Sequence, residues 1–239
     1  MKDQVVVIAG GSGEIGQAAG SLFARAGARV VLAARDRAKA EAAAAAMNAA
    51  GGEAYVADLD VTDAASVQAM TRQVAEELGR IDVLVNAFGV GMILPLEQAE
   101  APDIERVMQV NATGTILVTQ AVVGVMKQQK SGRVIQIPGI VGKYVMRGSS
   151  VYSASKFAVA GFTKAMVEET KRDGIGFSLL YLGGVATGFW DSPLVQMRVQ
   201  KEKMLTPGEV AKAIYYAASQ PAPGVLNELV IQPDSHQMV

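Results

Sequence analysis

Short runs of Val, Ile and Leu without polar alternation most constrain the fold, because they are typical of strands buried on both faces of a parallel sheet. Segments with helical patterning lie between these runs. The expected strands are Gln4–Ala9, Arg29–Ala33, Ala54–Ala57, Asp82–Val85, Arg133–Ile137, Gly176–Leu182 and Leu226–Gln232. The expected helices are Ile15–Ala26, Arg37–Ala50, Ala64–Leu78, Ile104–Gln129, Val151–Arg172 and Pro207–Ala218. The alternation predicts an α/β fold, a single doubly wound parallel sheet of about seven strands with helices on both faces, spanning residues 1–239 as one domain.

The composition argues against several classes of site. The chain has no cysteine, and its single histidine is His236. We therefore expect no disulfide, no Cys nucleophile, no Ser-His-Asp triad and no metal site. The net charge of −1 favours neither nucleic acid nor a membrane surface as a partner. No apolar run reaches about 18 residues, and no signal-peptide layout is present, so we expect a cytoplasmic protein with no membrane partner.

The stretch "VVVIAGGSGEIGQAAG" places a glycine-rich turn between the first expected strand and the first helix. Gly10 permits a sharp turn, Gly13 lets backbone approach a pyrophosphate, and Gly16 lets the helix pack closely on the sheet. The helix N-terminus would offer unpaired N–H groups and a positive dipole end to the phosphates. The turn therefore predicts a dinucleotide site. We interpret Glu14 as a first-turn acid that stabilises the helix dipole, in preference to a direct contact with the adenosine.

The end of the second expected strand bears on the choice of dinucleotide. Ala34 stands where an acid binding the ribose hydroxyls is expected, and Arg35 follows it. A guanidinium there suits a 2′-phosphate through charge-assisted hydrogen bonds. The alternative is a solvated arginine that begins a helix and is partly neutralised by Asp36. We expect NADP(H), with NAD(H) as the alternative.

Tyr152 and Lys156, in "VYSASKFAVAGF", are four residues apart and would share one helix face. A tyrosine of pKa about 10 is a poor base at neutral pH. A nearby ammonium stabilises the phenolate and lowers that pKa. Tyr152 would then give a proton to a carbonyl oxygen, or take one from an alcohol, while hydride moves to or from nicotinamide.

Taken together, these segments resemble the short-chain dehydrogenase/reductase family over essentially the whole chain. The motifs that carry the resemblance are "AGGSGEIG", "DLDVTD", "VNAFG", "VMQVNATG", "YSASK" and "GGVAT". The resemblance implies a Rossmann-type oxidoreductase in which Tyr152 is the acid/base, Lys156 binds the nicotinamide ribose and modulates the tyrosine, and Asn111 supports a proton-relay water. With the glycine turn and Arg35, the implied cofactor-binding set is Gly10, Ser12, Gly13, Glu14, Ile15, Gly16, Arg35, Asp60, Val61, Asn86, Gly89, Tyr152, Lys156, Val185 and Thr187. The resemblance also implies a homodimer or homotetramer.

Two departures from the family's pattern bear on function. The Gly10-x-x-Gly13-x-x-Gly16 spacing resembles the family's extended members, in which position 14 is an ordinary side-chain position. In "IQIPGIVG", Gly139 falls where the family's catalytic serine stands. Losing a comparable oxyanion donor costs about 100- to 1,000-fold in rate. Substitute hydroxyls would have to come from nearby serines, which we interpret instead as loop and helix-cap residues: Ser149, Ser150 and Ser153.

The segment at about 183–206 is the expected substrate loop. Its apolar residues could line a pocket with those of the loop after the fourth strand, and core or subunit packing is an equal alternative. The residues concerned are Phe189, Trp190, Leu194, Met197, Met92, Ile93 and Leu94. We predict an NADP(H)-dependent oxidoreductase that interconverts a carbonyl and a secondary alcohol on a small, fairly apolar substrate. The alternatives are a nucleotide-binding sensor, partner or scaffold with little or no redox activity, and an atypical reaction that does not need the serine.

Overall fold

The computed structural model of the protein describes residues 1–235 and 237–238, so His236 lies outside the described residues. Its strands form one parallel sheet in the order β3-β2-β1-β4-β5-β6-β7. The strands are β1 (Val5–Ala9), β2 (Arg29–Ala34), β3 (Glu53–Asp58), β4 (Val83–Asn86), β5 (Gly132–Gln136), β6 (Ile175–Leu182) and β7 (Glu228–Ile231). The predicted sheet is confirmed, and the seven expected strands are all present, with small shifts at their ends.

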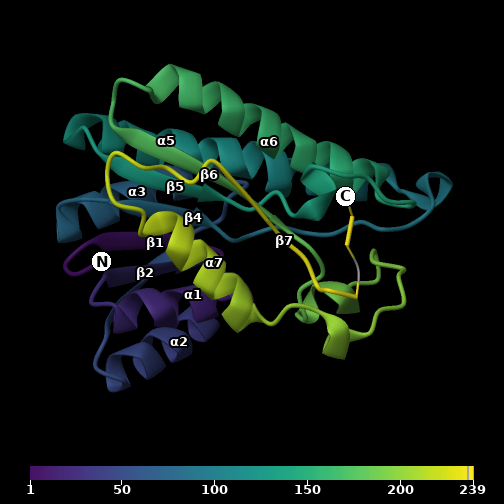
Figure 1. Ribbon diagram of the computed structural model, residues 1–239, viewed down its shortest axis with the longest axis horizontal. Coiled ribbons are helices and arrows are strands. Elements are labelled where there is room, and N and C mark those ends of the chain that lie inside the picture. Colours follow the sequence, from purple (N-terminus) through teal and green to yellow (C-terminus); the bar gives the residue numbers. More distant parts are fainter. Residues whose placement is uncertain (236, 239) are drawn as a thin grey trace.

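Helices cover both faces of this sheet (Figure 1). They are α1 (Glu14–Arg25), α2 (Arg37–Ala49), α3 (Ala64–Leu78), α4 (Ala101–Met108), α5 (Gly114–Gln129), α6 (Ser150–Thr170) and α7 (Pro207–Ala218). One buried cluster, which includes Phe23 and Ile214, packs α1, α2 and α7 against the sheet. A second, which includes Met70 and Val122, packs α3 and α5 against the other face. The unalternated apolar strands are therefore covered on both sides, as their composition predicts.

The long helix expected at Ile104–Gln129 is not continuous. A helix begins earlier, at Ala101, because Pro102 is tolerated in the first turn, where no intrahelical N–H bond is needed. A π-helical turn at Gln109–Thr113 then separates α4 from α5. Such turns are rare and occur frequently at functional sites. Here the turn contains Asn111, which is fully buried.

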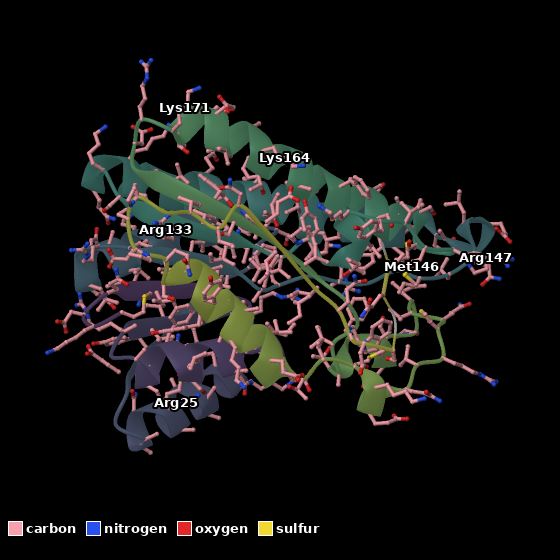
Figure 2. The ribbon with its side chains drawn as sticks, in the orientation of Figure 1. Arg25, Arg133, Met146, Arg147, Lys164 and Lys171 are labelled. Carbon is pink, nitrogen blue, oxygen red and sulfur yellow. The ribbon has the colours of Figure 1, made fainter. Side chains whose placement is uncertain are left out.

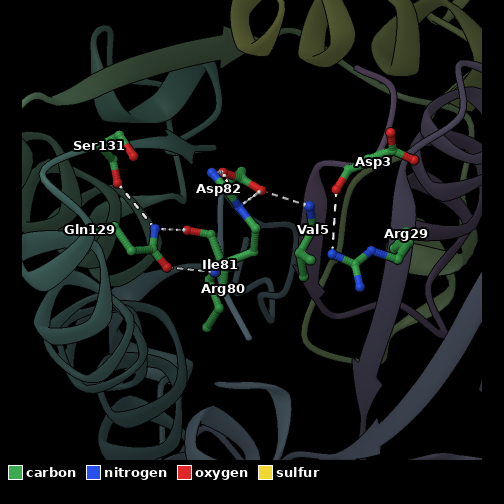
Figure 3. A network of polar contacts seen from close by, with 8 residues as sticks. All are labelled: Asp3, Val5, Arg29, Arg80, Ile81, Asp82, Gln129 and Ser131. Carbon is green, nitrogen blue, oxygen red and sulfur yellow. Dashed lines mark hydrogen bonds and ion pairs between the residues drawn. The ribbon is translucent and has the colours of Figure 1, made fainter. Parts of the chain in front are cut away.

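Polar contacts connect β1, β4 and α5 at the amino ends of the strands (Figure 3). The buried Asp82 carboxylate accepts from the backbone N–H of Val5 at 2.8 Å and pairs with Arg80 at 2.6 Å. Gln129, at the end of α5, accepts from Ile81 N and donates to Ile81 O. These contacts tie β1, β4 and α5 together.

The strand order reverses between β1 and β4, and ligands of such sheets bind outside the carboxyl ends of the strands at that point. The loops after β4 and β6 meet there through a short parallel pairing of Ile93 with Val195. Figure 1 shows the segment after β6 at this end of the molecule. In the described part of the chain, no helix has the length and apolar character needed to cross a membrane.

Candidate active site

A cavity of about 340 Å³ opens at the carboxyl ends of the strands, between the glycine turn, the N-terminal half of α6 and the loop after β6. Its walls are mostly apolar. The lining residues are Gly13, Glu14, Ile15, Ala87, Phe88, Gly89, Ile93, Ile137, Gly139, Ile140, Val141, Met146, Tyr152, Lys156, Leu182, Gly183, Gly184, Val185, Thr187, Gly188, Phe189 and Trp190. Arg147, next to Met146, is exposed at the edge of the molecule and does not line the cavity (Figure 2).

Tyr152 and Lys156 both lie in the wall of this cavity, as their spacing in α6 predicts. The Lys156 Nζ lies 5.8 Å from the centre of the Tyr152 ring and donates to the carbonyl oxygen of Ile137 at 3.3 Å. Lys156 is only 5% exposed. Its ammonium therefore faces both the phenol and the end of β5 in a place with little water.

The electrostatics of the pair differ from the direction expected from sequence. Burial raises the pKa of the Tyr152 phenol, because a phenolate would lose its hydration there. Burial also lowers the pKa of the Lys156 ammonium to about 8. Desolvation thus decides both directions in the chain alone, and for Tyr152 it outweighs the attraction that the ammonium exerts on a phenolate. At neutral pH the phenol is protonated.

Asn111 joins the loop after β4 to α6. Its Oδ1 accepts from Val90 N at 2.9 Å, and its Nδ2 donates to Val90 O at 2.9 Å and to Ser155 Oγ at 3.0 Å. Its own carbonyl oxygen accepts from the Thr115 hydroxyl at 2.7 Å. Asn111 does not line the cavity. Its bonds to Val90 fix the backbone next to Gly89. Gly89 in turn packs closely against Lys156, because a Cβ on Gly89 would lie 3.2 Å from the Lys156 Nζ.

The glycine turn has the geometry that a pyrophosphate requires. Gly10 has φ +87°, and a Cβ on Gly16 would lie 2.4 Å from the Gly10 carbonyl oxygen. Helix α1 begins at Glu14 without a side-chain cap on Gly13, which leaves the first-turn N–H groups for a ligand. These observations fit a dinucleotide, whose phosphates the first-turn N–H groups of α1 could hold. The Ser12 carbonyl oxygen accepts a hydrogen bond from Gln17 Nε2, which links the turn to the first turns of α1.

The tips of β2 and β3 hold the residues expected at the adenosine end. Arg35 is exposed and forms no ion pair within residues 1–235. Arg37, by contrast, is paired with Glu41 and Asp58. Hydrogen bonds from Thr62 lower the pKa of the Asp60 carboxyl, and the nearby Arg35 charge acts in the same direction.

Two further predicted residues lie beneath the site. Val61 is buried and packs against Gly114, where a Cβ would lie 3.0 Å from its side chain. Asn86 donates to Thr119 and Gln136 in the core, and its Oδ1 has no partner among the described residues. Neither lines the cavity.

Gly139 has a backbone conformation that an L-residue rarely adopts. Its φ of 67° and ψ of 173° fall in a region populated almost only by glycine. Ser149 and Ser153 do not line the cavity; their hydroxyls lie 2.8 Å apart, and Ser149 donates to the Met146 carbonyl. Among the lining residues, the Thr187 hydroxyl is bonded within its own turn, to Val185 O and Phe189 N.

The loop after β6 covers Tyr152 with aromatic rings. The Phe189 ring lies 5.6 Å from the Tyr152 ring, and Trp190 packs edge-on against Phe189 at 5.1 Å. Trp190 Nε1 donates to Val185 O at 2.8 Å. Phe189 fits because Gly91 has no side chain, since a Cβ there would lie 2.3 Å from the ring. Phe189 and Trp190 are thus in the cavity wall, which is one of the two alternatives left open by the sequence.

Other parts of the expected apolar pocket lie elsewhere. Met92 and Leu94 point into a small separate core with Val107, and Leu194 packs against that core. Met197 is 38% exposed. Of the three consecutive residues Met92–Leu94, only Ile93 lines the cavity, which is the alternation expected of extended backbone. Four further residues line the cavity without having been predicted individually from the sequence: Ile140, Val141, Met146 and Gly188.

A parallel sheet that reverses order at a glycine turn, with a tyrosine–lysine pair in an adjoining cavity, defines a Rossmann-type α/β protein. The pattern described as short chain dehydrogenase matches residues 4–196. The chain therefore belongs to the short chain dehydrogenase family.

Several of the relatives carry the names of oxidoreductases. A 3-oxoacyl-[acyl-carrier-protein] reductase of Synechocystis sp. is 34% identical over 224 residues, covering 92% of this chain and 90% of that protein. A glycine betaine reductase of Emericella nidulans is 31% identical over 239 residues, but the chain spans only 19% of its length. An alcohol dehydrogenase from the archaeon Thermococcus sibiricus, complexed with 5-hydroxy-NADP, superposes with a TM-score of 0.90 at 26% identity over 99% of both chains. The chain is an NAD(P)-dependent dehydrogenase or reductase of this family.

Proposed function

We propose that the protein is an NADP(H)-dependent oxidoreductase that interconverts a carbonyl and a secondary alcohol on a small, fairly apolar substrate. The observation that carries the proposal is the pair of Tyr152 and Lys156 in the wall of one apolar cavity that also reaches the glycine turn. Among the residues that the structure describes, the cavity wall contains no arginine, and its charged residues are Glu14 and Lys156. A neutral substrate therefore matches the lining better than a carboxylate or a phosphate.

The protonation states of the pair are compatible with carbonyl reduction. A bound nicotinamide dinucleotide would supply hydride to the carbonyl carbon. Tyr152, protonated at neutral pH, donates its phenolic proton to the carbonyl oxygen, so that the alcohol forms. The Lys156 ammonium, facing the ring, stabilises the phenolate that remains. Asn111 is assigned a positioning role, because it holds the Val90 backbone and Ser155 in place.

The proposed nucleotide site uses the glycine turn for the pyrophosphate and the loop segment with Val185 and Thr187 for the nicotinamide end. Arg35 would bind the 2′-phosphate. Its guanidinium is exposed and not engaged in an ion pair with another described residue, which supports NADP(H) over NAD(H). The segment at 183–206 is proposed as the substrate loop, and a homodimer or homotetramer as the assembly.

Tyr152→Phe tests the assignment of the acid. Turnover of a panel of neutral ketones and secondary alcohols is followed by nicotinamide absorbance. We expect a loss of about 100- to 10,000-fold, the usual contribution of a general acid, with NADP⁺ binding retained. Tyr216→Phe, at an exposed position on α7, is the matched control. Unchanged turnover in Tyr152→Phe would refute the assignment.

Arg35→Ala tests the choice of cofactor. We expect the dissociation constant for NADPH to rise about tenfold or more, because a charge-assisted hydrogen bond is lost, while that for NADH stays the same. Arg25→Ala, at an exposed position on the last turn of α1, is the control. Equal weakening of both nucleotides would contradict a role at the 2′-phosphate.

A second candidate function is nucleotide binding with little or no redox activity. It is favoured by Gly139, which provides no hydroxyl, and by the engagement of Ser149 and Ser153 with each other. Tight NADP(H) binding without turnover across the same panel would support it. Turnover of one substrate at a useful rate would exclude it.

A further inference from the structure

Glu14 connects the glycine turn to the segment that follows β6. Its Oε2 accepts a hydrogen bond from the backbone N–H of Gly188 at 2.8 Å. Both residues line the cavity, although 174 positions separate them in the chain. A first-turn acid that only stabilised the dipole of α1 would need no such partner. The carboxylate therefore joins two segments of the cavity wall.

Gly188 begins the turn that places aromatic rings over Tyr152. This turn, η4 (Gly188–Asp191), carries Phe189, whose ring packs 5.6 Å from the Tyr152 ring. The Glu14 contact is one residue away from Phe189 along the chain. It therefore restrains the backbone that sets the position of this ring.

The same carboxylate lies where the phosphates of a dinucleotide would approach. Glu14 is the first residue of α1, whose N-terminal N–H groups have no side-chain cap. The positive end of the helix attracts a carboxylate and a phosphate alike. A pyrophosphate bound there would bring negative charge close to Glu14, and the two charges would repel each other.

We propose that Glu14 is a positioning residue that couples nucleotide binding to the aromatic cover of the cavity. In the nucleotide-free chain its carboxylate holds Gly188 and keeps Phe189 against Tyr152. The approach of the phosphates weakens this bond, and the η4 turn is then released to admit a substrate. The coupling rests on the nucleotide binding of the proposed function.

The first measurement needs no nucleotide. Trp190, in the η4 turn, is the only tryptophan of the chain, so its fluorescence reports on this segment. Acrylamide quenching is compared in the wild type, Glu14→Ala and Glu14→Gln. Asp103→Ala is the matched control, because Asp103 is also a first-turn acid, on α4. Thermal melts verify that each variant is folded.

We expect Glu14→Ala to raise the quenching constant about twofold, because local opening of the turn exposes the indole. Glu14→Gln should raise it less, since the amide oxygen can still accept from Gly188. Asp103→Ala should leave it unchanged. Equal quenching in the wild type and Glu14→Ala would overturn the proposal.

The second measurement is a titration with NADP⁺ by calorimetry. Both Glu14 variants should bind NADP⁺ about three- to tenfold more tightly, because the phosphates no longer displace a charged hydrogen-bond acceptor. Asp103→Ala should bind like the wild type. Unchanged affinity in both Glu14 variants would overturn the coupling alone. Absence of NADP⁺ binding in the wild type and all variants would overturn the proposed function, and the coupling with it.

Discussion

Burial of Lys156 should make the stability of the fold depend on pH in a definite direction. The pKa of this ammonium falls from its ordinary 10.5 to about 8 in the folded chain. Below the folded value the lysine is charged in both states, so folding carries the full cost of moving the charge out of water, about 3 kcal/mol. Between the two pKa values the unfolded chain binds more protons, so stability rises with pH. Above the unfolded value the cost is absent.

Lys156→Met isolates this effect, because it removes the charge and keeps an unbranched side chain of similar length. Urea unfolding of both proteins is measured near pH 7 and near pH 10. The wild type should gain about 2–3 kcal/mol relative to the variant between these pH values, while the groups that both proteins share cancel. Lys171→Met, at an exposed position, should show almost no gain. A stability difference between wild type and Lys156→Met that is the same at both pH values would refute the reasoning.

Two further predictions concern Gly91, which packs against the Phe189 ring, and Gly139, which lines the cavity. Gly91→Ala puts a methyl carbon 2.3 Å from the Phe189 ring, so the ring must move. Because Trp190 packs against this ring, we expect a red shift of the Trp190 emission. An unchanged spectrum would contradict this packing. Gly139→Ala and Gly139→Ser should each lower the free energy of unfolding by about 1–3 kcal/mol, because both must adopt a φ of 67°. Turnover by the serine variant above that of the alanine variant would show that a hydroxyl helps, and equal stability to wild type in both would contradict the strain.

The sheet could be read from sequence because burial on both faces leaves a direct mark on strand composition. The π-helical turn at Gln109–Thr113 has no comparable signal in the sequence. It forms where Asn111 bonds to Val90, a contact across the fold that local patterning does not encode. The outcome for the loop after β4 is intermediate. The cavity faces Ile93 and not Met92 or Leu94, and a period of two along that short stretch could have been recognised.

The residues of the site were found more readily than their chemistry. The spacing of Tyr152 and Lys156 was enough to predict a shared helix face. The direction of their pKa shifts depends on how much water reaches them, which follows from packing by distant residues such as Phe189. In the same way, the acid in the glycine turn was visible, but its partner Gly188 could be identified only after folding.

The contacts around Asp82 hold one end of the sheet, and the cavity occupies the other. Substitutions in the loops that surround the cavity therefore share no side-chain partner with the residues that anchor β1 to β4. Their effects on unfolding should add to those of substitutions at the anchor, as is usual for distant sites. In a fold arranged in this way, substitutions at the carboxyl ends of the strands can change the ligand preference, while the contacts at the amino ends continue to stabilise the sheet.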